Sequence, residues 1–178
     1  MHTEHAIGRF LHGGFTRACR VMAAVICLEP AAHSEGNEME IAIETTVDAP
    51  IERVWAAWVT PDAITQWNFA SDDWCCPKAE IDLVVGGKFN YRMEAKDGSI
   101  GFDFEGTFTT IDPQAVIEYA LADDRQVRIR FTQTESGVRV VETFDAEDEH
   151  SAEQQRQGWQ LILDNFKAHT EQQQITKR

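Results

Sequence analysis

Apolar and polar residues alternate along most of the chain between residues 79 and 147, and turn-forming residues interrupt the alternation at short intervals. A period of two puts successive side chains on opposite faces of the backbone, which is typical of strands with one buried face. Short strands separated by such turns predict an antiparallel meander. With a further strand near residue 40, we expect about seven strands. The expected turns lie at Asp97-Gly98, Asp112-Pro113, Asp123-Asp124 and Ser136-Gly137.

Two adjacent glycines stand at the start of this region, in the segment VVGGKFNYRM of residues 84–93. Two residues between alternating runs indicate a tight hairpin, because glycine adopts the positive φ that other residues resist. A phosphate-binding loop would need a helix directly after the glycines, and KFNYRMEA is typical of a strand instead. We therefore expect Gly86 and Gly87 to join two strands. Ile81, Leu83 and Val85 would share one face of the first strand, and Phe89, Tyr91 and Met93 one face of the second.

The segment before the meander predicts one strand and two short helices. Residues 40–50 alternate and end at Pro50. Residues 51–59 then carry apolar side chains at helical spacing. Thr60 followed by Pro61 is the start signal of a second short helix.

The last part of the chain predicts one long amphipathic helix. Ser151 with Gln154 three residues later forms a capping box. The large apolar partner available to this helix is the concave face of the meander, so we expect the helix to lie across the sheet. Gly158 interrupts the helix at a cost of roughly 1 kcal/mol relative to alanine, which suggests that it leaves room for a neighbouring backbone or a ligand. The apolar stripe consists of Trp159, Ile162, Leu163 and Phe166.

Charge and cysteine usage exclude several classes of function. The formal net charge of -14 would repel nucleic acid and anionic lipid surfaces, so neither is an expected partner. Cys19, Cys27, Cys75 and Cys76 form no CxxC pair, so no metal, cofactor or disulfide framework is predicted. The expected location is the cytoplasm.

Residues 1–38 differ from the rest of the chain. They hold four of the six histidines and one short apolar run, VMAAVICL, which is too brief to span a bilayer. We interpret them as a poorly ordered extension or as an overlong gene model whose natural start is Met39, and a weak signal peptide is the alternative. The predicted domain covers residues 39–172, followed by a tail of residues 173–178.

The order of elements and several motifs resemble the START and birch-pollen-allergen superfamily, also called SRPBCC, in its heat-shock-protein-90 ATPase activator-like branch. Family members commonly carry Trp-Gly-Pro after the second helix, where this chain has WNFASDDWCCP. The residues that carry the resemblance are Ala49-Pro50, Val54-Trp55 and Trp67, the hairpin residues Gly86, Gly87, Phe89 and Tyr91, then Gly106, Thr107 and Pro113, and finally Gly158 and Trp159.

The resemblance implies an α+β helix-grip fold, in which a curved antiparallel sheet is packed against two short helices and one long C-terminal helix. Such a fold tends to leave an apolar cavity, so the function we expect first is binding of a small hydrophobic molecule. A co-chaperone-like role on a chaperone ATPase is an alternative, and a weak homodimer also stays open. The expected ligand-binding residues are Trp55, Trp58, Trp67, Tyr91, Met93, Phe102, Phe104, Gly158, Trp159, Ile162 and Phe166.

Catalysis would need a polar group inside this cavity, and alternation identifies one candidate. Glu142 shares its strand face with Val138, Val140 and Phe144, so it is a carboxyl group on an apolar side. If buried, it would have a raised pKa and could act with Tyr91 as an acid/base pair in a cyclase or hydrolase. The other interpretation is an edge-of-sheet carboxylate paired with Arg130 or Arg139. We expect binding in preference to catalysis.

Overall fold

A computed structural model describes residues 39–172, and the predictions for residues 1–38 and 173–178 fall outside that range. Between residues 39 and 172 the chain forms seven strands and three helices. In chain order these are β1 (Glu40–Val47), α1 (Ile51–Val59), α2 (Pro61–Trp67), β2 (Trp74–Ile81), β3 (Lys88–Ala95), β4 (Gly101–Asp112), β5 (Val116–Leu121), β6 (Gln126–Thr134), β7 (Gly137–Asp145) and α3 (Ala152–Gln172).

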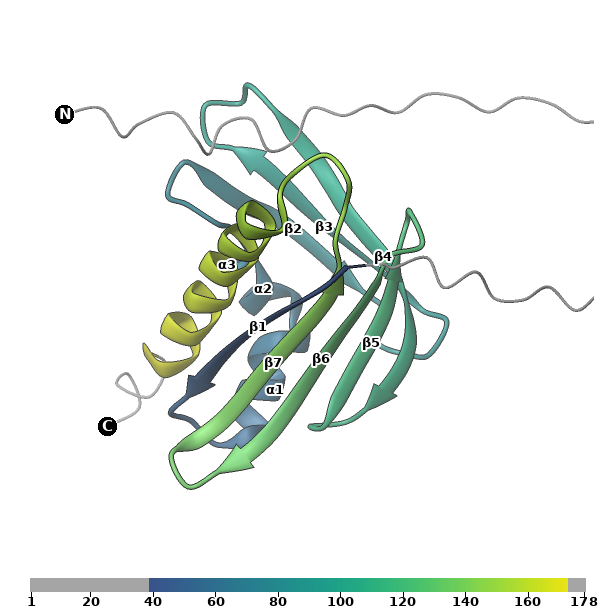
Figure 1. Ribbon diagram of the computed structural model, residues 1–178. Coiled ribbons are helices and arrows are strands. Elements are labelled where there is room, and N and C mark those ends of the chain that lie inside the picture. The colour runs from purple at the N-terminus through teal and green to yellow at the C-terminus, as the bar shows by residue number, and fades with distance from the viewer. Residues whose placement is uncertain (1–38, 173–178) are drawn as a thin grey trace, which may run out of the picture.

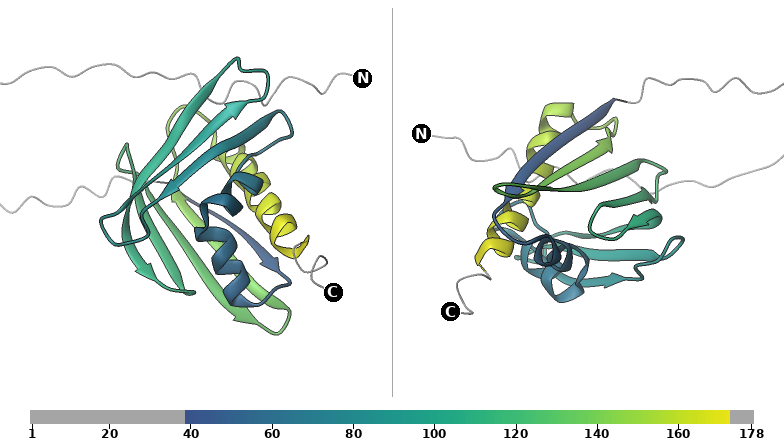
Figure 2. Two further views of the ribbon diagram at one scale, coloured as in Figure 1. Left: turned by 180° about the vertical axis from the view of Figure 1, so that it is seen from behind. Right: turned by 90° about the horizontal axis from the view of Figure 1, so that it is seen from below.

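The strands form one antiparallel sheet in the order β1-β7-β6-β5-β4-β3-β2. The sheet curls, with α1 and α2 on its concave side and α3 beside β1 (Figures 1 and 2). The α+β helix-grip fold is thereby confirmed. The strands from β4 to β7 lie where the alternation predicts them, because each has one face on the core and one in solvent.

The predicted two-residue hairpin at the glycine pair is wrong. The last residue pair of the β2–β3 ladder joins Ile81 to Phe89, so the connection runs over residues 82–87. Val84 and Val85, expected at or beside the strand's end, are 54% and 65% exposed. Backbone hydrogen bonds instead tie Gly86 and Gly87 to Phe108 on β4, at 2.8 and 2.9 Å. Contacts with a third strand, which local alternation does not encode, decide the shape of this loop.

Strand β2 also begins earlier than its alternation indicates, at Trp74. Its register with β3 shifts between Cys75 and Lys78. Pro77 lies within this irregularity, where a missing backbone N–H interrupts no regular ladder bond. This bulge interrupts the alternation of apolar and polar residues in β2. The alternation is therefore recognisable in the sequence only from Ala79 onward.

Helices α2 and α3 cover the two free edges of the sheet. Helix α2 packs against β2 and α3 against β1. Three side chains of α3, those of Arg156, Gln160 and Lys167, donate hydrogen bonds to carbonyl oxygens at alternate positions of β1. An uncovered edge would present these carbonyls to another chain. The helix therefore satisfies the backbone of the edge strand as well as burying apolar surface.

The apolar stripe of α3 packs on the core as predicted, two of its members fully and Trp159 and Ile162 in part. Leu163 is 1% exposed and Phe166 is fully buried. The Phe166 ring lies edge-on to Trp58 and Trp67, with centroids 4.8 and 5.0 Å apart. These contacts join α3 to α1 and α2 on the concave side of the sheet, where burial of each large side chain contributes roughly 1.5–3 kcal/mol.

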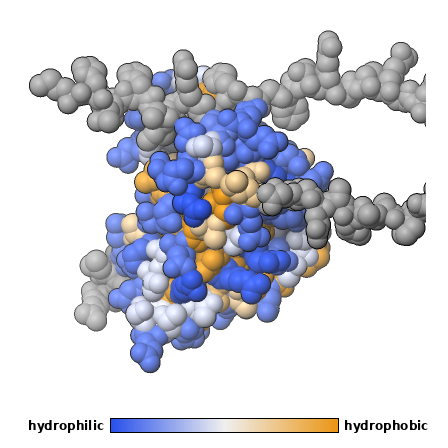
Figure 3. Space-filling view, in the orientation of Figure 1, coloured by the Kyte–Doolittle hydropathy of each residue, from blue (hydrophilic) through white to orange (hydrophobic). Residues whose placement is uncertain are grey.

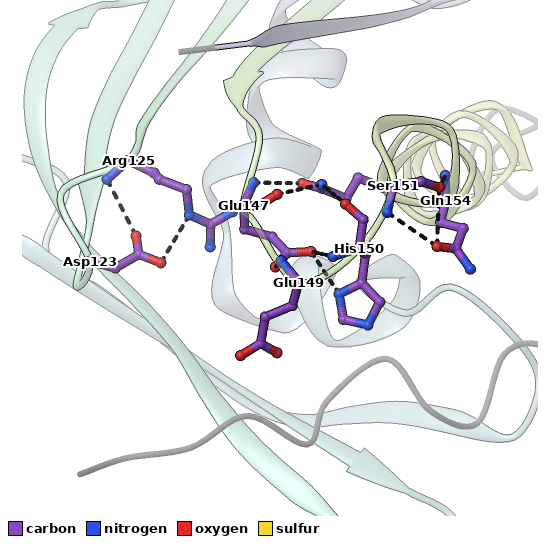
Figure 4. A network of polar contacts seen from close by, with 8 residues as sticks. Asp123, Arg125, Glu147, Glu149, His150, Ser151 and Gln154 are labelled. Atoms are coloured by element: carbon purple, nitrogen blue, oxygen red, sulfur yellow. Dashed lines mark hydrogen bonds and ion pairs between the residues drawn. The ribbon is translucent and has the colours of Figure 1, made fainter. Parts of the chain in front are cut away.

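The loop from β7 into α3 is held by a network of side chains (Figure 4). The predicted capping box is present, because the Ser151 and Gln154 side chains each accept a hydrogen bond from the other's backbone N–H at 3.2 Å. Gln155 is buried, and its amide accepts from the backbone N–H of Glu147 at 2.9 Å. The same amide donates to the carbonyls of Glu147 and His150 at 3.0 and 2.9 Å. One buried glutamine thus satisfies three backbone groups.

The face of the molecule seen in Figure 1 is mostly hydrophilic, and its apolar residues gather in a band near the middle (Figure 3). Of the helices in residues 39–172, none combines the length and the apolar character that crossing a membrane requires.

Replacing Gln155 should lower stability more than replacing a neighbouring glutamine. Gln155→Leu leaves three backbone groups of a part-buried loop without partners, so the free energy of unfolding should fall by about 2 kcal/mol or more. Gln157→Leu on the exposed side of the same helix should change it by less than about 0.5 kcal/mol. Urea denaturation of both variants measures the difference. Equal effects would contradict the role assigned to Gln155.

Candidate functional site

The predicted ligand-binding residues other than Gly158 all lie in the hydrophobic core or against its edge. Trp67, Met93 and Phe166 are buried. The others keep part of their surface accessible, as large aromatic side chains often do. These half-buried residues are Trp55, Trp58, Tyr91, Phe102, Phe104, Gly158, Trp159 and Ile162.

Trp159 on α3 spans the two arms of the curled sheet. On one side its ring stacks on Phe144 of β7, with centroids 4.0 Å apart and planes at 14°. On the other side it meets Phe104 of β4 edge-on at 6.0 Å. Phe104 in turn stacks with Tyr91 of β3 at 6.4 Å. Trp159 therefore lies across the interior that the helix and the sheet enclose.

A second ring cluster lies under α1. Trp58 meets Phe131 of β6 edge-on at 5.5 Å, and Trp55 meets the same ring at 5.5 Å. Trp58 also contacts Trp67 at 5.3 Å. The sequence prediction thus selected residues that contact one another in two adjoining clusters, whereas Phe102 lies farther out against Trp74 at 6.0 Å.

Two surface hollows of about 320 and 120 Å³ lie outside this enclosed region. Neither is lined by any of the predicted ligand-binding residues, whose rings contact one another instead. A ligand would therefore enter the interior by displacing side chains, above all those that are already half-buried.

Gly158 borders open space. A Cβ atom at this position would meet no heavy atom within 4 Å beyond its own stretch of helix. The residue is half-buried and directly precedes Trp159. Packing against a neighbouring backbone therefore does not explain the glycine.

Glu142 is the buried carboxyl group of this interior. Its neighbours across the sheet are Ile43 and Ile129, and its side chain is 6% exposed. The predicted alternative, a pair with Arg130 or Arg139, is wrong, because Arg139 pairs with Glu44 on the solvent face. Within residues 39–172 no hydrogen bond or ion pair reaches the Glu142 carboxyl. Burial alone raises its pKa to about 8.

Other titratable groups lie between Glu142 and the far arm of the sheet. Tyr119 is 7% exposed, and burial raises the pKa of its hydroxyl, followed by the charges of Glu142 and Tyr91. Burial likewise raises the pKa of Tyr91, which also interacts with Cys76. Burial raises the pKa of the Cys76 thiol to about 11. Near neutral pH these groups are mainly protonated, so they can donate hydrogen bonds to an acceptor.

Tyr119 and Cys76 are not among the site residues predicted from the sequence. Tyr119 alternates with Ile117 and Leu121 on β5, and this pattern could have placed its hydroxyl inside. After burial, the charges of Glu142 and Tyr91 raise the pKa of the Tyr119 hydroxyl, so Tyr119 lies within electrostatic range of both members of the acid/base pair proposed from the sequence. The bulge before Lys78 hid the corresponding pattern around Cys76.

One acidic group offers the geometry of a metal site among the described residues. Ligand atoms of Glu147, Glu149 and His150 lie within 4.8 Å of one another. The Glu147 carboxylate already accepts hydrogen bonds from the backbone N–H groups of Glu149 and His150 at 2.7 and 2.9 Å (Figure 4). These bonds account for the cluster as part of the loop, and we assign no metal to it.

Comparison with known proteins supports the same architecture. The sequence model of the family described as Activator of Hsp90 ATPase homolog 1-like protein matches residues 48–171. None of the curated proteins matches the chain significantly. A solution structure of an AHSA1-like protein from Aeromonas hydrophila is 46% identical, covers 79% of this chain and 97% of its own, and has a TM-score of 0.74.

Two further solved structures are similar. A protein from Cytophaga hutchinsonii, determined in solution, is 43% identical over 78% of this chain and 96% of its own, with a TM-score of 0.66. A crystal structure from Nitrosomonas europaea is 18% identical over 78% of this chain and 97% of its own, with a TM-score of 0.64, and shows the common fold alone.

Glu142→Gln should change how stability depends on pH. The unfolded carboxyl ionises near pH 4.5, whereas the folded one stays protonated up to about pH 8. The free energy of unfolding of the wild type should therefore fall as pH rises between these values, by an amount on the order of 5 kcal/mol. Glu142→Gln has no ionisable group at this position, so its free energy of unfolding should not fall in this way. Urea denaturation at several pH values, with Glu105→Gln as a surface control, tests this. Parallel curves for wild type and Glu142→Gln would contradict it.

Two glycine variants should have opposite effects. Gly158→Ala places a methyl group in open space and removes a poor helix former, so it should raise the free energy of unfolding by about 0.5–1 kcal/mol. At Gly106 a Cβ would lie 2.8 Å from the Phe89 ring and 2.7 Å from the Ala120 carbonyl oxygen. Gly106→Ala should therefore destabilise the fold by about 1–3 kcal/mol. Destabilisation by Gly158→Ala would show that its space is occupied.

Proposed function

The chain belongs to the family of Activator of Hsp90 ATPase homolog 1-like proteins, and on that basis we propose that it binds a small hydrophobic molecule between α3 and the curled sheet. The observation that carries this proposal is Glu142, a buried carboxyl group without a partner in residues 39–172. Burial keeps this carboxyl protonated near neutral pH, so a ligand could supply the hydrogen-bond partner that residues 39–172 do not.

The surrounding side chains support an apolar ligand body. Trp55, Trp159 and Ile162 face the interior and remain half-buried. Completing their burial would add favourable free energy at roughly 25 cal/mol for each Å² removed from water. Aromatic rings also offer large contact areas with few rotatable bonds.

The polar groups favour a ligand with one hydrogen-bonding end. The Glu142 carboxyl and the Tyr119 hydroxyl are coupled, and both are protonated near neutral pH because burial raises their pKa values. They would donate to a carbonyl, hydroxyl or ether oxygen of a ligand whose remaining surface is apolar. A basic amine would also suit Glu142, because it would accept the carboxyl proton and form an ion pair.

An enzyme acting on an aromatic or hydrophobic substrate is the second candidate, and the same carboxyl group favours it. A pKa of about 8 suits a general acid near neutral pH. In a cyclase or hydrolase Glu142 would deliver the proton, with Tyr119 and Tyr91 as further donors. Such an enzyme would lose turnover in Glu142→Gln, whereas a binding protein would keep its affinity for an apolar probe.

A co-chaperone role would follow from the family description alone, and an assay separates it from binding. An activator would raise the ATP hydrolysis rate of a chaperone in the absence of any ligand. We further propose, from the net charge of -14, that nucleic acid is not a partner, and, from cysteines that suggest no disulfide framework, that the protein acts in the cytoplasm.

Two adjacent residues of α3 provide a matched test of the proposed site. The neutral fluorescent probe N-phenyl-1-naphthylamine should bind the wild type with a saturable, blue-shifted emission. Ile162→Gln places an amide on the half-buried side and should weaken probe binding by about tenfold or more. Leu161→Gln changes a 42% exposed position on the same helix and should leave binding unchanged.

Thermal denaturation and circular dichroism of both variants control for loss of structure. Equal affinities in wild type and Ile162→Gln, with both proteins folded, would overturn the proposed site. Native mass spectrometry of protein purified from its own host would then identify a natural ligand by its mass.

A further inference from the structure

A hollow separate from the interior lies between α1, α2 and the last turns of α3. It has a volume of about 320 Å³, close to the lower end for small-molecule sites. Its floor is widened by small side chains at three alanine positions. Its lining residues are Arg53, Ala56, Ala57, Thr60, Asp62, Ala63, Gln66 and His169.

Arg53 lines this hollow, and one nitrogen of its guanidinium also has an unfilled hydrogen-bonding requirement. Its Nη1 atom is buried, and none of the described residues accepts a hydrogen bond from it. Asp62 lines the same hollow, yet no ion pair of residues 39–172 joins it to Arg53. A guanidinium N–H that has lost water without gaining an acceptor is costly, so the fold keeps this group at the expense of stability.

The charge of the chain makes an unpaired arginine informative. Acidic residues number 30 against 16 lysines and arginines, so carboxylate partners are abundant. Seven of the other described arginines and lysines find one, for example Arg92 with Glu94 at 2.8 Å. Arg53 is thus a cation whose position in a hollow leaves it open to an external anion.

We propose that this hollow binds a small organic carboxylate, with Arg53 as the anchoring cation. A guanidinium presents two parallel N–H groups that match the two oxygens of a carboxylate. Thr60 and Gln66 lie at the rim as further hydrogen-bonding side chains, and the alanines face the apolar part of the ligand. Burial lowers the pKa of His169, so Arg53 supplies the positive charge.

This site is independent of the proposed function. On α1, Arg53 lies two residues from Trp55, a spacing that puts their side chains on different sides of the helix. Arg53 borders the outer hollow, whereas Trp55 contacts Phe131 of the sheet. A failure of one site therefore does not entail a failure of the other.

The test uses the full chain and sodium benzoate as the probe, at an ionic strength held constant with sodium chloride. Benzoate should raise the Tm of the wild type in a saturable way, and the neutral analogue benzyl alcohol should not. Arg53→Gln should weaken the apparent affinity for benzoate at least tenfold. Without benzoate this variant should be as stable as the wild type or more stable, because it lacks the unpaired cation. Arg130→Gln, an exposed arginine on β6, is the matched control.

Two results would overturn the proposal. One is an unchanged benzoate effect in Arg53→Gln. The other is loss of the effect in Ile162→Gln, which would place benzoate in the interior. Amide chemical shifts of a labelled sample give the location directly, and the expected changes fall on residues 53–66 and on His169.

Discussion

The docking of α3 is the interaction on which the rest of the structure depends. The helix does two things at once: Leu163 and Phe166 bury apolar surface, while Arg156, Gln160 and Lys167 satisfy the free carbonyls of β1. A curled sheet has two edges and one concave face, and each would be unstable in water if left uncovered. Helix α3 covers one edge and, with α1 and α2, encloses the concave face.

The region enclosed by the helices and the sheet differs from a fully apolar core, because it contains a buried carboxyl group and aromatic side chains that are only half-buried. Glu142 lies among isoleucines without a partner, and Trp159, whose ring meets Phe144 and Phe104, stays half-buried. Both features lower stability relative to a fully apolar, fully packed interior. Their position on the concave face, opposite α3, is where a ligand would remove both costs. Arg53, on the outer side of α1, is likewise a polar side chain with a buried atom that has no hydrogen-bond partner.

Much of the fold followed from local patterns. The alternation located β4 to β7, and the capping box of Ser151 located the start of α3, because both signals depend on neighbours in sequence. The candidate site could be predicted in part. The alternation of side chains along β7 indicated that Glu142 lies on the apolar face, and helical spacing indicated that Trp159 and Phe166 face the core. Tyr119 alternates equally clearly with the apolar residues of β5, so it could have been predicted as a site residue. The orphaned Nη1 atom of Arg53 could not, because an acceptor's absence is a property of three helices together.

The sequence by itself determined which residues alternate, where helices begin and which side chains share a face, since these properties extend over only a few residues. Tertiary structure decided the path of residues 82–87, because the hydrogen bonds of Gly86 and Gly87 go to Phe108, some twenty residues away. It also decided the protonation of Glu142. A carboxyl group on an apolar strand face is solvated or buried according to what covers that face, and here the cover comes from helices distant in the chain.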